Sequence, residues 1–175
     1  INSTAATTMD YIAGILVGGG AVGTTKVLYN TIKLAGVSAY SAPGFAMAIG
    51  SGNPSIEMKN NIFVNEMTST FGKNYALGLA YNGSFSNLNS DRNDFFTTAS
   101  PLAIAGGLNN TPSGNLTNLA AYQALTGKDM NSKNALPEFV SSTDLHLTTA
   151  AVNLINLDGK GAPVSTTIDI DWDTR

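Results

Sequence analysis

Residues 53–68, NPSIEMKNNIFVNEMT, indicate the fold class of this chain. The stretch opens on an Asn-Pro turn signal, and apolar Ile56 and Met58 then alternate with polar neighbours, which is the period of a β-strand. A pair of asparagines, Asn60-Asn61, follows, and a second apolar run occupies residues 62–64. The pattern therefore predicts β-structure on both sides of an asparagine pair.

The same pattern recurs along the chain with a period of about 30 residues. It appears earlier as VLYNTI at residues 27–32 and later as DRNDFF at residues 91–96. Expected strands start at Tyr11, Phe45 and Tyr75, at steps of 34 and 30, and a second series holds Asn30, Asn60 and Asn93, at steps of 30 and 33. Two interleaved series with one period are typical of a repeat architecture.

Short strands without a helical pattern between them exclude helical repeats and strand–helix–strand units. The remaining architecture is a parallel β-solenoid, in which each coil lies on the one before it. Asn30, Asn60 and Asn93 would then stack about 4.8 Å apart as a ladder of hydrogen-bonded amides. The alternative is that these asparagines only serve turns, where the residue is common.

Composition excludes several classes of partner. Charged residues make up 12% of the 175, the net charge is −3, and no Lys/Arg cluster exists to neutralise phosphates, so a nucleic-acid partner is excluded. The longest apolar run, within residues 11–22, is interrupted by glycines and is too short to span a bilayer, so no membrane insertion is expected. The chain has no cysteine, which excludes disulfides and thiol catalysis.

Several phrases resemble coils of a known family. KVLYNTIKL (residues 26–34), IEMKNNIFVN (56–65), NSDRNDFF (89–96) and KNYALGLAY (73–81) are similar to coils of the right-handed parallel β-helix proteins of the pectate-lyase-like superfamily. The segments LAAYQ (119–123), LPEFV (136–140), DLHL (144–147) and DID (169–171) resemble the closing region of secreted surface proteins of Bacteroidetes and related bacteria. The resemblance implies an all-β, right-handed parallel β-helix at the exterior of a bacterium.

The expected organisation is a single domain over residues 1–175, with repeat coils in 1–114 and a closing region in 115–175. One short helix is predicted near 118–126. Thr117 or Asn118 can cap its start, Leu119 and Tyr122 share a face, and Gly127 ends it. This helix is expected on the flank of the solenoid. Further strands are predicted at residues 136–140, 145–148, 152–155 and 164–171.

No convincing catalytic set is present, but two groups of residues are candidates for chemistry. Asp144 and His146, the only histidine, would share a strand face as an acid/base pair, or lie on the surface without a role. Asp91, Arg92 and Asp94 lie on one expected strand. Enzymes of the superfamily place such residues on a solenoid face, for Ca²⁺-assisted lyase chemistry or glycoside hydrolysis. Asp91 and Asp94 are three residues apart and would point to opposite faces.

Other candidates concern binding. Asp169, Asp171 and Asp173 alternate and could hold Ca²⁺, or form a solvated acidic tail. Tyr81 and Trp172 could stack on sugar rings, although aromatic residues on strands mostly belong to the core. Trp172 replaces a glycine that such chains usually carry in an Asp-Ile-Asp-Gly-Asp ending. Apart from a possible Ca²⁺, no cofactor is expected.

The ends of a solenoid supply the functional hypothesis. Each end exposes strand edges and apolar core, and residues 1–10 show no amphipathic helix that would cover the first coil. The sequence therefore favours a non-catalytic structural or adhesive protein, which assembles with copies of itself into filaments or a surface layer, or belongs to a longer chain. The alternatives are a carbohydrate-active or glycan-binding module, of the polysaccharide lyase or glycoside hydrolase kind, and a passive spacer.

Overall fold

The computed structural model describes residues 11–20, 23–38, 41–70, 72–109 and 111–164. Strands predominate and helices are few, which confirms the predicted all-β class. The strands are β1 Ile12–Val17, β2 Thr24–Leu28, β3 Thr31–Ser38, β4 Gly44–Ile49, β5 Ser55–Lys59, β6 Ile62–Ser69, β7 Asn74–Leu79, β8 Leu88–Asp91, β9 Asp94–Thr97, β10 Ala103–Ala105 and β11 Asn115–Leu116. A 3-10 turn at Pro112–Gly114 and the helices α1 Leu119–Thr126 and α2 Ala151–Asn156 complete the elements.

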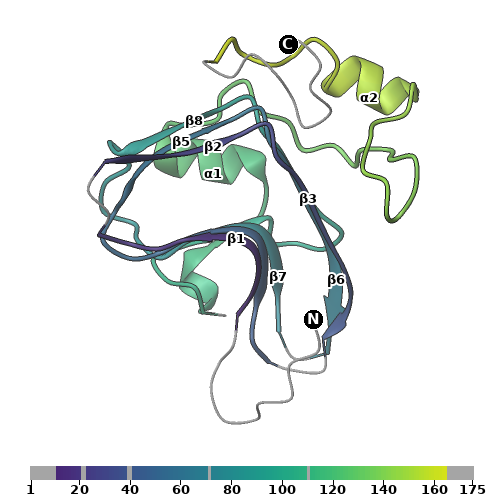
Figure 1. Cartoon of the computed structure of the whole chain (residues 1–175). Helices are drawn as coiled ribbons and strands as arrows, with labels where there is room; N and C mark the ends of the chain where they lie inside the picture. The colour runs from purple at the N-terminus through teal and green to yellow at the C-terminus, as the bar shows by residue number, and fades with distance from the viewer. Residues whose placement is uncertain (1–10, 21–22, 39–40, 71, 110, 165–175) are drawn as a thin grey trace.

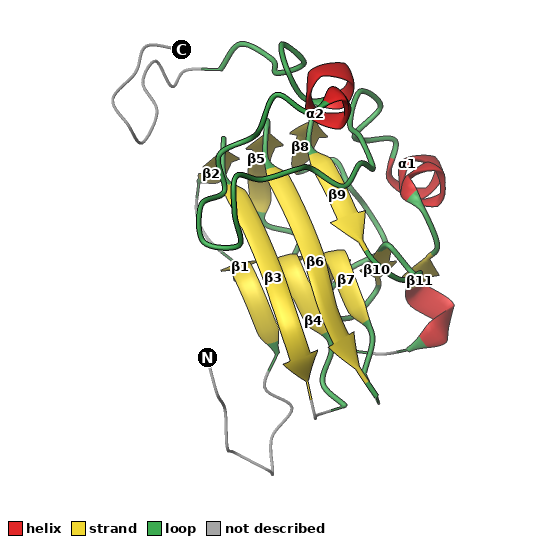
Figure 2. Ribbon diagram, turned by 90° about the vertical axis from the view of Figure 1, so that its right-hand side faces the viewer, coloured by secondary structure: helices red, strands yellow, loops and turns green. Residues whose placement is uncertain are grey.

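The strands form three sheets, and the chain visits the sheets in turn. The orders are β1-β4-β7-β10-β11, β2-β5-β8 and β3-β6-β9, and every pair is parallel except β10-β11. We call one passage through the three sheets a coil, so that β1–β3 form the first coil, β4–β6 the second and β7–β9 the third. Figure 2 shows the coils side by side, with β3, β6 and β9 in sequence across the view.

Register brings equivalent residues of successive coils into columns. Ile32 pairs with Phe63, and Phe63 with Phe95, so that three apolar side chains of one column point into the interior. The two phenyl rings stack with their centroids 5.7 Å apart. Phe63 and Phe95 are fully buried in one continuous hydrophobic core, and partly buried Ile32 packs against it. The repeat in the sequence is therefore a repeat of core positions.

A sharp corner separates the second and third strand of each coil. Tyr29, Asn60 and Arg92 stand at this corner with positive φ angles of 55°, 59° and 57°. These left-handed residues turn the backbone, and an asparagine follows each of them. The pattern in residues 25–34 favours one continuous strand, and this prediction is wrong, because the corner divides these residues between β2 and β3.

A fourth coil begins with β10, which pairs in parallel with β7, and helix α1 follows after β11. The side chain of Asn118 accepts a hydrogen bond from the Ala121 amide, and left-handed Gly127 ends the helix, as the sequence predicted. Tyr122 is buried against Phe95, with ring centroids 6.0 Å apart, and so extends the Phe63–Phe95 column by one ring. The helix therefore covers the end of the stack and not its flank, as Figure 2 shows.

Residues 138–162, which we call the terminal lobe, pack beside the corner of the coils (Figure 1). Residues 152–155, expected as a strand, lie in α2. The two other strands expected here are reduced to one antiparallel bridge between Phe139 and Leu147. Buried Asn153 holds the lobe together, because its side chain bonds both the amide and the carbonyl of Glu138 and the carbonyl of Thr148. Residues 165–171 of the last expected strand lie outside the described residues.

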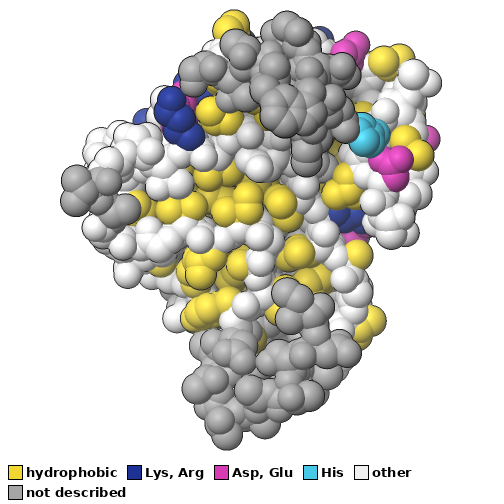
Figure 3. Space-filling model, in the orientation of Figure 1, with side chains coloured by type: hydrophobic (Ala, Val, Ile, Leu, Met, Phe, Trp, Pro, Cys, Tyr) yellow, Lys and Arg dark blue, Asp and Glu magenta, His cyan; other side chains and the backbone are white. Residues whose placement is uncertain are grey.

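The first coil differs from the last in exposure. Its inward side chains Ile15, Val17 and Ile32 pack on the core but are only partly buried, whereas their register partners Met47, Ile49 and Phe63 are fully buried. Figure 3 looks onto this coil and shows rows of hydrophobic side chains with few charges among them. We call these side chains, together with the edges of β1–β3, the first-coil face. Residues 1–10, which were predicted to lack a cap, lie outside the described residues.

Candidate functional site

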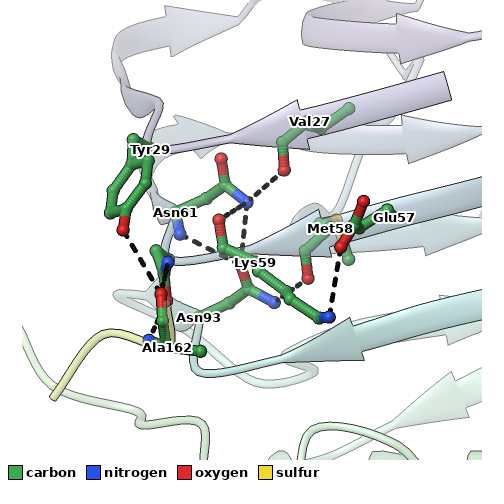
Figure 4. Close-up of polar contacts among 9 residues, drawn as sticks. Val27, Tyr29, Glu57, Met58, Lys59, Asn61, Asn93 and Ala162 are labelled. Atoms are coloured by element: carbon green, nitrogen blue, oxygen red, sulfur yellow. Dashed lines mark hydrogen bonds and ion pairs between the residues drawn. The ribbon is translucent and has the colours of Figure 1, made fainter. Parts of the chain in front are cut away.

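An asparagine ladder runs through the corner of the three coils, and Figure 4 shows its bond between Asn61 and Asn93. The Nδ2 of Asn30 donates to Oδ1 of Asn61 at 3.0 Å, and the Nδ2 of Asn61 donates to Oδ1 of Asn93 at 2.8 Å. The backbone amides of Asn30 and Asn61 donate to the same two oxygens. Each oxygen thus accepts two bonds from the coil before it, so all rungs have the same polarity.

The ladder ends on Asp129, which follows α1. Nδ2 of Asn93 donates to Oδ1 of Asp129 at 2.9 Å, and the backbone amide of Asn93 donates to Oγ of Ser132. The hydroxyl of Tyr122 donates to the second oxygen of Asp129 at 3.0 Å. A carboxylate accepts without needing to donate further, so Asp129 terminates a chain of donors. Burial raises the pKa of Asp129, although its four side-chain donors oppose that rise.

The predicted ladder is correct at its two ends and wrong by one residue in the middle. Asn30 and Asn93 belong to it, but Asn61 and not Asn60 supplies the bond between them. Asn60 occupies the left-handed corner position, and its side chain bonds the terminal lobe instead: Nδ2 donates to the carbonyl of Ala162, and Oδ1 accepts from its amide. The hydroxyl of Tyr29 also donates to that carbonyl.

Outside the ladder, a cavity of about 340 Å³ separates the corner of the coils from the terminal lobe. On the coil side it is lined by Asn60, Asp94 and Lys133, and on the lobe side by Leu147 and residues 156–161. Two residues of the coils hold the end of the lobe, since Arg92 Nη1 donates to the carbonyl of Lys160 at 2.8 Å and Asn60 Nδ2 donates to the carbonyl of Ala162. This cavity is the candidate functional site.

Asp94 is the chemically distinctive group of the cavity. Its side chain is 1% exposed; Oδ1 accepts the amide of Ala135, and Oδ2 is buried without a hydrogen-bond partner. Burial raises the pKa of Asp94 to about 7, against the smaller opposing effect of the Ala135 amide. A carboxyl that is half protonated near neutral pH can both give and take a proton.

Lys133 follows Asp94 in the same column through a parallel bridge. No ion pair joins their side chains in the described part of the chain. The cavity thus offers one carboxyl, one ammonium group and several amides to a polar ligand.

Asp91 and Arg92 do not join Asp94 in one acidic group. Asp91 accepts from the backbone amide and the side chain of Asn131 at 2.9 and 2.8 Å. Partial burial would raise the pKa of Asp91, but these hydrogen bonds and Arg92 outweigh it and lower that pKa. Asp91 thus serves to fix residue 131, and Arg92 to hold the lobe.

Asp144 and His146 do meet, but neither lines the cavity. Oδ1 of Asp144 lies 2.6 Å from Nδ1 of His146 on a tight turn of the terminal lobe, and both side chains are well exposed. The hydrogen bond from His146 lowers the pKa of Asp144. An exposed pair of this kind fixes the turn and provides no enclosed site for chemistry.

The remaining candidates lie elsewhere. Tyr81 packs on the core beside Phe85, with ring centroids 5.6 Å apart, and its hydroxyl is buried without a partner. Burial raises the pKa of Tyr81. Trp172, Asp169, Asp171 and Asp173 lie outside the described residues. Among the described residues, no group of three His, Cys, Asp or Glu could hold a metal ion.

Three comparisons with known proteins found no relative of the chain. No protein-family model, curated protein or solved structure matches it. Within the described ranges, no helix has the length and hydrophobicity that crossing a bilayer requires.

Sequence reasoning missed Asp129 and Lys133. Asp129 lies 36 residues after Asn93, outside the period of the ladder, because α1 is inserted between the two. Lys133 continues the Thr31, Ile62, Asp94 column by a single bridge, which leaves no strand pattern to recognise. Only the carboxylate itself, as a possible acceptor at the end of an amide ladder, could have pointed to Asp129.

Proposed function

We propose that the chain is a right-handed parallel β-helix with a structural or adhesive role at the exterior of a bacterium. The order of the three sheets supports this, because each strand from β1 to β7 pairs in parallel with the strand three places on along the chain. Parallel crossovers in one sheet are right-handed in nearly all proteins, which gives the helix its hand. The resemblance of the coils to the pectate-lyase-like superfamily supports the same fold and location.

The observation that carries the structural role is the difference between the two ends. Beyond the third coil, α1 and residues 129–135 bury Phe95 and bond the asparagine ladder. Before the first coil, three strand edges and partly exposed Ile15, Val17 and Ile32 face outward. Parallel strand edges beside apolar side chains are a template for further strands. The first-coil face is therefore the joining surface, and its partner is another coil, from a second chain or a longer parent chain.

The interior favours a load-carrying role over a catalytic one. The ladder amides inside the corner are bonded to one another and to the backbone: Asn61 also donates to the carbonyl of Val27 and Asn93 to that of Met58. Fully bonded buried networks make a core rigid and specify one register.

Light scattering over a concentration series, beside negative-stain electron microscopy, tests this function. We expect concentration-dependent multimers that Ile32→Lys and Thr25→Lys prevent, because each places a charge on the first-coil face. Val37→Lys is the matched control: Val37 lies on the same strand β3 but is 83% exposed already. Circular dichroism checks that each variant is folded.

A strictly monomeric chain at every concentration would contradict the joining role and favour a passive spacer. Multimers that persist in both charge variants would also contradict it, because the contact would then lie elsewhere.

The cavity beside Asp94 favours a second candidate function, a carbohydrate-active or glycan-binding module. A carboxyl with a pKa near 7 can act as general acid toward a glycosidic oxygen. Screening polysaccharides for binding and cleavage tests it. Turnover that Asp94→Asn abolishes and Asp144→Asn leaves intact would establish it and overturn the non-catalytic role.

A further inference from the structure

The polarity of the asparagine ladder specifies which partner fits the first-coil face. Asn61 Oδ1 accepts the amide and the Nδ2 of Asn30, and Asn93 Oδ1 accepts the same two groups of Asn61. Asn30 Oδ1 stands in the same position on the first coil. Within the described part of the chain, no hydrogen bond reaches this oxygen, and the Asn30 side chain is only partly buried.

The geometry points to a parallel coil that precedes the first one and carries an asparagine at its corner. Such a coil would donate its corner amide and Nδ2 to Asn30 Oδ1, as Asn30 does to Asn61. Its inward residues would cover Ile15, Val17 and Ile32 as the second coil covers the third. This inference rests on the proposed function and defines the chemistry of its partner: a parallel β-segment with a side-chain amide donor between two apolar runs.

Neither end of a second copy of this chain offers that chemistry. The closed end terminates in Asp129 Oδ1 and Oδ2, which are acceptors already bonded by Asn93, Ser132 and Tyr122. The first-coil face of another copy presents a second Asn30 Oδ1, so two acceptors would meet. Contact between two copies through this face therefore buries apolar surface without extending the ladder, and it is the weaker association.

The chain contains its own best probe. Residues 55–69, SIEMKNNIFVNEMTS, include β5, the corner and β6, and in the protein they already pair in parallel with β2 and β3. A synthetic peptide of this sequence presents the amide and Nδ2 of Asn61 as donors, with Met58 and Phe63 as inward apolar residues. Added strands of this kind bind through main-chain bonds and are selected by side-chain pockets.

The experiment measures binding of the labelled peptide to the full chain by fluorescence anisotropy, and maps the contact by amide hydrogen exchange. The matched control is the peptide with Asn61→Asp, which keeps size and backbone but replaces the donor by an acceptor. We expect the first peptide to bind, to protect β2 and β3, and to bind roughly tenfold or more tightly than the control, because the Nδ2 hydrogen bond is lost and a carboxylate faces Asn30 Oδ1.

Each outcome decides the inference. Equal affinity of the two peptides, with protection of β2 and β3, would overturn the claim that the partner needs an asparagine at its corner. It would still support the first-coil face as the joining surface. Binding of neither peptide, or protection confined to α1 and residues 129–135, would overturn both. Thr25→Lys in the protein should abolish binding, and Val37→Lys should preserve it.

Discussion

The two ends of this molecule close the same core in different ways. At the end of the third coil, Phe95 is 1% exposed because Tyr122 of α1 lies against it. At the start, Ile32 occupies the same column and remains partly exposed, although its neighbour Phe63 is fully buried. Residues at equivalent positions thus differ in burial according to what lies beside them. The difference teaches that the burial of each coil is set by the element that lies beside it.

Truncating a core side chain at each end of the column should give the largest difference in stability between the two ends. Phe95→Ala removes a fully buried ring from between Phe63 and Tyr122, and we expect a loss of about 3–5 kcal/mol of unfolding free energy. Ile32→Ala, in the partly exposed place, should cost about 1 kcal/mol, since part of its surface is already in water. Urea denaturation measures both. Equal losses would contradict the claim that the first coil is open.

The second comparison is between two neighbouring asparagines: Asn61, which belongs to the ladder, and Asn60, which bonds the terminal lobe. Asn61→Ala leaves the amide and Nδ2 of Asn30 without their acceptor and removes the Nδ2 donor from Asn93 Oδ1, and we expect a loss of about 3 kcal/mol. Asn60→Gly, one residue earlier, keeps the left-handed backbone and loses only the bonds to Ala162, so it should cost about 1 kcal/mol. Urea denaturation measures both variants. A larger loss of stability at residue 60 than at residue 61 would support the prediction from sequence that Asn60 belongs to the ladder.

Stability should depend on pH through Asp94. Its folded pKa, near 7, is above its ordinary value of 3.8, so the folded state holds the proton more tightly. The contribution of Asp94 to stability is therefore greatest below pH 4, falls as the pH rises to about 7, and stays low above. Asp94→Asn should raise stability at pH 8 by about 2 kcal/mol and change little at pH 4, because an amide carries no charge.

Thermal unfolding from pH 4 to 8 measures this, with Asp91→Asn as the control. The hydrogen bonds of Asn131 lower the pKa of Asp91, so Asp91 should stabilise the fold above pH 4 and its loss should have the opposite sign. An Asp94→Asn variant that is less stable than the parent at pH 8 would show that the carboxylate is held by a partner.

The smallest effect concerns the polar closure of the covered end. Tyr122→Phe keeps the ring that covers Phe95 but removes its hydrogen bond to Asp129, and we expect a loss of about 1 kcal/mol. Asp129 retains its bonds from Asn93 and Ser132, which limits the damage. Denaturation of this variant beside Phe95→Ala measures how much of the closure is polar. If Tyr122→Phe loses as much unfolding free energy as Phe95→Ala, the hydrogen bond of the hydroxyl and not the ring would be the main contribution to the stability of this end.

Sequence reasoning found the repeat because core positions recur, and Ile32, Phe63 and Phe95 must be apolar in each coil. It placed the ladder one residue out because two asparagines stand side by side, and the left-handed backbone at Asn60 cannot be read from composition. It took residues 152–155 for a strand because four residues do not separate a strand from a helix by period. It named Asp94 but not its burial, since the lobe that covers it folds back from about 65 residues further along the chain.

The most direct test of the open and closed ends is amide hydrogen exchange of the wild-type chain at low and at high concentration. The structure predicts that β1, β2 and β3 exchange faster than β5 and β6 in dilute solution and become protected on concentration, while α1 and residues 129–135 do not change. Equal protection of the first and second coils in dilute solution, or protection gained at α1, would contradict the account.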